Sequence, residues 1–223
     1  MNTVKMKRNA IIGLIGGLLF GIGDLLVSLL PHYWDQSKIA EDWVQMSDLR
    51  PASAMYLGCI GAVLLVVGFY SWYAAVKENG STRLKYLMGS IVIGILMAPI
   101  GHFFILCITP MAYKGAIQAG ANTEMAMKIV DYWGTYTGPF SVYVIFFVIL
   151  VQSVTMIGLI LKRKINCPKW MVLCNPLGLT LLSIPCSILL SGTGLEGIVE
   201  SFESIGEGLI YLPVYYHWKK CSN

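Results

Sequence analysis

Four glutamates near the C-terminal end of the chain recur at helical spacing. The intervals between them are four, three and four residues, which places them all on one narrow stripe of a helix: Glu196, Glu200, Glu203 and Glu207. Carboxylates gathered in this way can bind a cation, share protons, or act as a general acid and base. The stripe is therefore the first candidate for a functional site.

Two further ionisable residues interrupt long apolar runs. Asp24 is the only Asp, Glu, Lys, Arg or His in the run at about 10–31, and His102 is the only one at about 86–110. A charge at the centre of a bilayer costs about 2.5–3.5 kcal/mol. At about 1.5 Å per residue, these groups and the glutamates lie about 8–18 Å from one side. We therefore expect one shared ligand-binding or ion-binding site, formed by Asp24, His102, Glu200, Glu203 and Glu207.

A face of small residues supports this convergence. Gly13, Gly17 and Gly21 recur every four residues and share a helical face with Asp24, followed by Ser28. Small residues at this spacing let another helix approach closely. The pattern predicts that Asp24 points into the protein and away from lipid.

Other polar residues are expected around the site. Arg50, beside Asp48, is predicted at the mouth, where it would neutralise Glu196 or Glu200. Tyr56 is a second predicted mouth residue, together with Glu196 itself. A stripe of hydroxyl side chains in a later run provides further lining: Thr180, Ser183, Ser187 and Ser191.

The composition indicates that these residues belong to a membrane protein. Hydrophobic residues make up 56% of the 223 positions and charged residues 13%, and the mean hydropathy is +0.67. This leaves too little polar surface to cover a water-soluble globule. We expect an all-α integral membrane protein of one domain, residues 1–223, with six transmembrane helices at about 10–31, 53–76, 86–110, 139–161, 170–191 and 195–217.

The basic residues predict the orientation of these spans. With the N-terminus inside, 12 of the 16 lysines and arginines fall in cytoplasmic segments, and only Lys38, Arg50, Lys114 and Lys128 fall outside. We therefore expect a plasma-membrane protein with both termini in the cytoplasm and the bilayer as its partner. No basic pattern typical of nucleic-acid binding is present. Aromatic residues such as Tyr33 and Trp34 fit the interfacial belts of such proteins.

Two outer segments are longer than a connection requires. Residues 32–52 and 111–138 mix acidic, amide and apolar residues, and we expect both to carry short helices over the outer mouth of the site. The six cysteines show no CxxC spacing and are interpreted as small apolar residues. Cys59 and Cys107 form the one pair worth testing as a disulfide.

Three functions fit this pattern. The first is an outward-facing acidic pocket that binds or transports a cation, a proton or a small amine-bearing solute. The second is an intramembrane lipid hydrolase, in which Asp24, His102 and Glu203 hold a metal ion or act as a base. Against it, the sequence contains no HExxH or GxSG motif, and it indicates no particular cofactor. The third is a structural or interaction protein, in which the polar residues bond one helix to another.

Two segments carry a family resemblance. GLIGGLLFGIGDLL at 13–26, with its Gly-Asp pair, and RPASAMYLGCIGAVLLVVGFY at 50–70 resemble an uncharacterised family of six-span bacterial membrane proteins. The resemblance covers most of the chain and implies no activity. Six spans with both ends inside are also similar to the substrate-binding components of vitamin uptake transporters. In those proteins the first helix carries spaced alanines, where this chain has glycines.

Overall fold

The computed structural model describes residues 2–35, 37–77, 82–102 and 106–222. Within these ranges the side chains of 99–102, 140, 141, 143–145, 147 and 148 are not described. Every regular element in the described ranges is a helix, and none is a strand. The all-helical class predicted from the sequence is therefore confirmed for this part of the chain.

The centre of the fold is α1 (Thr3–Ser28), which lies between α3 (Leu49–Lys77) and the C-terminal helices α9 (Ser201–Leu209) and α10 (Tyr211–Lys220). Asn2 caps α1 by accepting a hydrogen bond from the Lys5 backbone N–H. One glycine face of α1 meets α3, where Gly16 packs on the backbone of Gly61. The other face meets α9, where Gly17 packs on Gly208. Helices with side chains at these positions could not approach so closely.

Hydrogen bonds join α10 to α3 along its buried side. The Tyr211 hydroxyl donates to the Leu65 carbonyl at 2.6 Å, and the Trp218 indole donates to the Ser71 carbonyl at 3.0 Å. A one-residue turn at Ile210 separates α9 from α10. Pro213 lies one turn further and has no N–H to offer the Leu209 carbonyl, which accounts for the break.

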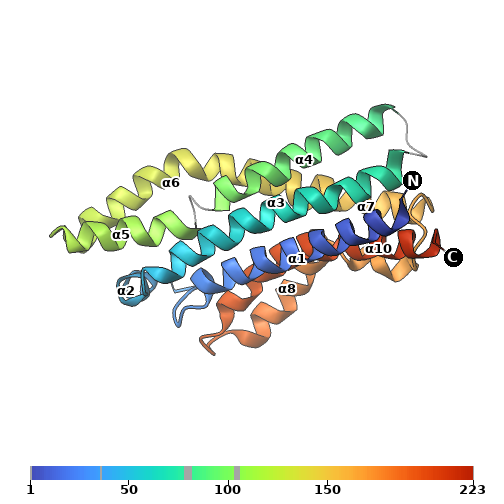
Figure 1. The fold of residues 1–223 in the computed structure, drawn as a ribbon. Coiled ribbons are helices and arrows are strands. Elements are labelled where there is room, and N and C mark those ends of the chain that lie inside the picture. Colours follow the sequence, from blue (N-terminus) through green and yellow to red (C-terminus); the bar gives the residue numbers. More distant parts are fainter. Residues whose placement is uncertain (1, 36, 78–81, 103–105, 223) are drawn as a thin grey trace.

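The remaining helices pack around this centre (Figure 1). Helix α4 (Thr82–His102) packs on α3, and α6 (Thr123–Ile145) packs on α4. The chain continues from α6 through a π-helix (Phe146–Val151) into α7 (Gln152–Leu161), whose first residue reaches α9. At one end, α2 (Ile39–Gln45) and α5 (Ile108–Gln118) pack together. A 3₁₀ turn (Lys169–Leu173), α8 (Pro176–Leu190) and a second 3₁₀ turn (Glu196–Glu200) lead into α9.

The predicted spans correspond to helical segments, with different ends. The fourth predicted span begins at about residue 139, but Pro139 lies inside α6, which begins at Thr123. The predicted outer segment 111–138 is thus mostly α5 and the first half of α6. The fifth span is reduced to α8, whose 15 residues extend about 22 Å, less than the hydrocarbon thickness of about 30 Å. Helix α2 confirms the short helix expected within 32–52. All six cysteines are free, so Cys59 and Cys107 form no disulfide in this structure.

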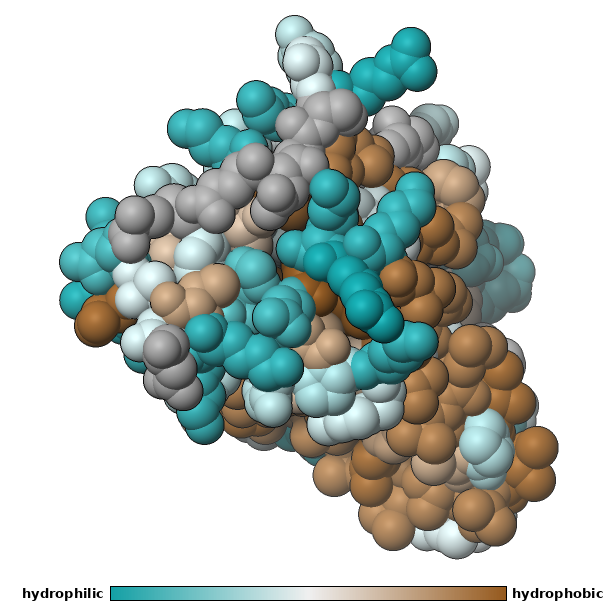
Figure 2. Space-filling model, turned by 90° about the vertical axis from the view of Figure 1, so that its right-hand side faces the viewer, coloured by the Kyte–Doolittle hydropathy of each residue, from teal (hydrophilic) through white to brown (hydrophobic). Residues whose placement is uncertain are grey.

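Hydrophilic residues cover part of the end of the molecule where both termini lie (Figures 1 and 2). This end carries exposed basic residues from the ends of several helices, among them Lys5, Lys77, Lys162, Lys164 and Lys219. The opposite end carries α2 and the turn between α5 and α6. Basic side chains from several helices thus lie at the end that holds both termini.

The flanks of the long helices are apolar and exposed. On α1, Ile11, Ile15, Leu18 and Ile22 form one stripe in which each side chain is more than 40% exposed. On α3, a similar stripe holds Tyr56, Ile60, Val63, Val67 and Tyr70. Among the described residues, α1 and α3 are the two helices long and apolar enough to cross a membrane.

Candidate functional site

Asp24 is buried where α1 faces α9. Its side chain is 2% exposed, hydrogen-bonds with Ser204, and interacts electrostatically with Glu203 and Glu200. One turn further along α1, the Ser28 hydroxyl contacts the Gly197 carbonyl at 2.8 Å. The glycine face therefore directs Asp24 into the protein, where it meets the helix that carries the glutamates.

A pocket of about 240 Å³ opens between α8 and α9. Helix α8 provides a row of hydroxyl groups, and Glu200 and Glu203 approach from the other side. The lining is completed by the aromatic ring of Trp34 and two aliphatic side chains. Its residues are Trp34, Thr180, Ser183, Ile184, Ser187, Val199, Glu200 and Glu203.

The hydroxyl groups of this pocket present acceptors rather than donors. Thr180 donates its proton to the Pro176 carbonyl, Ser183 to the Thr180 carbonyl and Ser187 to the Ile184 carbonyl, at 2.7–2.9 Å. Their remaining lone pairs accept hydrogen bonds. Together with two carboxyl groups, they give the pocket walls rich in acceptors.

Glu207 lies one turn beyond Glu203 and is 5% exposed. Its Oε2 atom accepts a hydrogen bond of 2.8 Å from the Gln152 side-chain amide, and Gln152 is fully buried. Gln152 follows directly after the π-helix and so comes from a different part of the bundle. The glutamate stripe thus runs from the pocket into the protein interior.

The segment after α1 brings two aromatic residues to the pocket. Burial raises the pKa of Tyr33, and the nearby Glu200 and Asp24 carboxylates raise it further. Its ring meets that of Trp34 edge to face, with 5.5 Å between centroids. Trp34 in turn lines the pocket.

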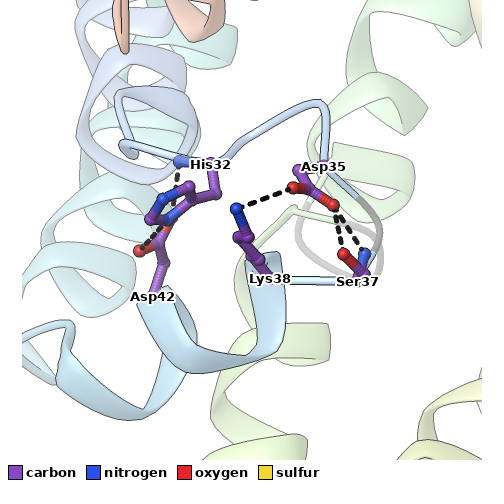
Figure 3. Close-up of polar contacts among 5 residues, drawn as sticks. All are labelled: His32, Asp35, Ser37, Lys38 and Asp42. Atoms are coloured by element: carbon purple, nitrogen blue, oxygen red, sulfur yellow. Dashed lines mark hydrogen bonds and ion pairs between the residues drawn. The ribbon is translucent and has the colours of Figure 1, made fainter.

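Hydrogen bonds hold this segment in place (Figure 3). Asp42 accepts from the His32 backbone N–H at 2.8 Å and contacts the His32 ring at 3.1 Å. The Ser37 hydroxyl and N–H both donate to Asp35, which lowers the pKa of Asp35. Lys38 completes the set, with its ammonium 3.7 Å from Asp35. Asp42 of α2 thereby anchors the start of the segment that carries Trp34, and Asp35 joins its later part through Ser37 and Lys38.

Two of the residues predicted at the mouth of the site, Arg50 and Tyr56, lie away from the pocket. Arg50 donates to the Leu26 and Leu29 carbonyls at 2.6 and 2.8 Å, so it caps the end of α1. Among the ion pairs of the described residues, none joins Arg50 to Glu196 or Glu200. Tyr56 is 73% exposed on the flank of α3.

The other predicted polar residues divide between the pocket and its surroundings. Glu196 accepts a hydrogen bond from the Gly192 N–H in the turn after α8. Ser191 ends α8 and does not line the pocket. The side chain of His102 lies outside the described residues, so the hydrolase hypothesis stays a prediction.

The sequence left two contributors unassigned to the site. Trp34 was expected only as an interfacial aromatic residue, and its place depends on the path of the segment held by Asp42. Gln152 is an amide in the middle of an apolar run, which is a signal in the sequence that a polar contact is made there. Among the described residues, no group of three or more His, Cys, Asp or Glu side chains is arranged to hold a metal ion.

Comparison with known proteins gives one match. Residues 1–221 match the model of a family described as Family of unknown function (DUF6796). This confirms the resemblance to an uncharacterised family. Neither the curated proteins nor the solved structures contain a match.

Proposed function

Because the chain belongs to the DUF6796 family of unknown function, we propose a function from the site itself. The protein is a multi-pass protein of the plasma membrane that binds, for transport, a small positively charged solute in the pocket between α8 and α9. The observation that carries this proposal is the pocket lining, with two carboxyl groups and three hydroxyl groups whose protons are already donated to α8.

The exposed surface supports the membrane part of the proposal. Stripes of isoleucine, leucine, valine and tyrosine along α1 and α3 would be contiguous apolar surface in water, which soluble monomers rarely tolerate. The same side chains are favourable against lipid. Helix α8 adds further exposed residues, including Ile188 at 72% and Leu189 at 79%.

The charge distribution supports the orientation. Basic residues at the end that holds both termini correspond to a cytoplasmic face under the positive-inside rule. The pocket and α2 lie toward the other end of α1, since Trp34 and Glu200 are near its C-terminus. In this orientation the pocket opens to the outside.

The pocket wall consists mainly of hydrogen-bond acceptors and therefore favours a positively charged ligand. A metal cation, an ammonium or a primary amine supplies positive charge or N–H donors to walls that offer acceptors. An anion would be repelled by the carboxylates and by the lone pairs of the hydroxyl oxygens. The ring of Trp34 adds a surface that attracts an organic ammonium.

Thermal unfolding of the purified protein tests this function. The protein in detergent is mixed in turn with inorganic cations, primary amines and quaternary amines. A ligand at about one hundred times its Kd should stabilise the wild type by about 2.7 kcal/mol. Glu203→Gln keeps the shape of the side chain and removes its charge, so this stabilisation should be lost.

Glu124→Gln is the matched control, because Glu124 is exposed and pairs only with Lys128 in the next turn of α6 among the described contacts. It should keep the full response to the ligand. The proposal fails if no cation or amine stabilises the wild type. It also fails if Glu203→Gln and the wild type respond equally.

A further inference from the structure

The buried pair of Glu207 and Gln152 has an incomplete set of hydrogen bonds. The amide nitrogen of Gln152 donates to Oε2 of Glu207 at 2.8 Å. The other oxygen of each side chain, Oε1, is fully buried and has no hydrogen-bond partner in the structure. Two acceptors without a donor, enclosed in a bundle interior, each cost about 1–3 kcal/mol.

Among the described residues of the elements packed around Glu207, no positive group lies close enough to act on its carboxyl group. Helix α9 itself contributes Glu203, and α1 contributes Asp24 across the interface. From α10 comes Tyr211, whose hydroxyl proton is donated to the Leu65 carbonyl. The sequence of α8 contains no charged residue, and the 3₁₀ turn before α9 adds only further carboxyl groups. A carboxylate at Glu207 would thus be surrounded by acceptors and other acids.

One proton resolves this arrangement. A proton on the Glu207 carboxyl group supplies the missing donor and removes the buried charge. Amide and carboxyl groups are both planar with two polar atoms, so a neutral acid can exchange two hydrogen bonds with one amide. The existing bond already aligns one side of such a pair.

We propose that Glu207 and Gln152 form an internal proton-binding site. In this site Glu207 takes up and releases one proton in exchange with water in the acidic pocket. Glu203 is the intermediate carrier, because it lines the pocket and lies four residues from Glu207 on the same face of α9. In this reaction the Glu207 carboxylate binds a proton and becomes a carboxylic acid, and no other reactant takes part.

The local backbone supports a specific role for Gln152. It is the first residue after the π-helix Phe146–Val151. π-Helical turns insert one extra residue per turn, re-aim the side chains that follow, and are found often at functional sites. Without this insertion, residues after position 151 would face a different direction, and the amide would not be aimed at Glu207.

Infrared spectroscopy tests the site without any pocket ligand. Spectra of the protein in liposomes are recorded across a pH series, and the carbonyl band of protonated carboxyl groups is followed. We expect one component of this band to disappear in Glu207→Gln. In Gln152→Leu the same component should still be present, but at a shifted frequency, because the Glu207 carboxyl group has lost its hydrogen-bond partner.

Glu41→Gln, at an exposed position on α2, is the control and should leave the component assigned to Glu207 unchanged. The proposal is overturned if the Glu207→Gln spectrum equals that of the wild type at every pH. It is also overturned if Gln152→Leu leaves the frequency unchanged. Should Glu207→Gln fail to fold, the shift in Gln152→Leu alone decides the matter. Because no solute is present, this result is independent of the proposed pocket ligand.

Discussion

Gly17 of α1 and Gly208 of α9 meet backbone to backbone. A Cβ atom on Gly17 would lie 2.1 Å from the Gly208 nitrogen and 2.2 Å from its Cα atom. Both atoms belong to the main chain, so neither can move aside by a change of rotamer. This contact sets the distance between the helix that carries Asp24 and the helix that carries the glutamates.

Gly17→Ala should therefore destabilise the protein. Adding one methyl group to so tight a contact forces the helices apart, at a cost of about 1–3 kcal/mol. Thermal unfolding in detergent measures the loss as a lower Tm. Gly158→Ala on α7 is the control, since a Cβ there meets nothing within 4 Å. Alanine favours helix by up to about 1 kcal/mol over glycine, so the control should keep or raise the Tm.

Sequence spacing was sufficient to predict this face of α1 but not what it contacts. A four-residue repeat at Gly13, Gly17 and Gly21 shows which face of the helix lacks bulky side chains, because helical geometry is regular. Its partner, Gly208, is nearly the whole chain away. Only the packing of the C-terminal helices against α1 reveals that contact, and with it the place of Asp24 beside Glu203.

Helix ends and loop paths were harder to predict. The predicted fourth span begins at about residue 139, since a proline such as Pro139 usually interrupts the interior of a helix. In apolar helices, neighbouring groups can satisfy the freed carbonyl, and α6 continues through it. Trp34 reaches the pocket on a segment that Asp42 holds through His32, and a contact between residues ten positions apart leaves no periodic signal in the sequence.

Asp42→Ala should loosen the segment that carries Trp34. Asp42 is 8% exposed, and its loss leaves the His32 N–H without its acceptor, which costs about 1–3 kcal/mol. We expect faster protease cleavage within residues 32–38 and a lower Tm. Glu41→Ala, at the exposed neighbouring position, should behave as the wild type. Equal cleavage rates for the two variants would contradict this role of Asp42.

Cysteine labelling tests the proposed orientation. Cys221 is free and exposed near the C-terminus, and Glu41 is exposed on α2. With all other cysteines replaced by alanine, a membrane-impermeant maleimide should modify Glu41→Cys in intact cells and leave Cys221 unmodified. Permeabilised cells should show both reactions. Labelling of Cys221 in intact cells would place the C-terminus outside and reverse the topology.

Replacing Trp34 should discriminate between classes of positive ligand. Cation–π attraction contributes about 0.5–2 kcal/mol, so Trp34→Ala should weaken tetramethylammonium binding by up to about thirtyfold. Trp34→Phe should retain part of that affinity. Binding of an inorganic cation held by Glu200 and Glu203 should change less. Trp170→Ala is the control, since Trp170 is 62% exposed and does not line the pocket. Equal losses for both ligand classes would exclude a ring contact with the solute.

The two proposals together predict a specific pH dependence of ligand binding. Protons and a positive solute compete for the same carboxyl groups, so the affinity for the solute should rise as the pH rises. Each proton released adds one negative charge near the ligand. The charge of Glu207, one turn from Glu203, also attracts the ligand through space. This attraction is stronger in a bundle interior than in water. Kd is measured by calorimetry across the pH range, with the same amine throughout.

In Glu207→Gln the affinity should still rise with pH, because Glu200 and Glu203 continue to titrate, but the slope should be smaller. At low pH, where Glu207 carries its proton in the wild type, the two proteins should bind equally well. The difference between them should therefore appear only as the pH increases, with the wild type binding more tightly. Identical slopes would show that the charge of Glu207 does not reach the pocket, and weaker binding at every pH would show that the substitution disturbs the pocket itself.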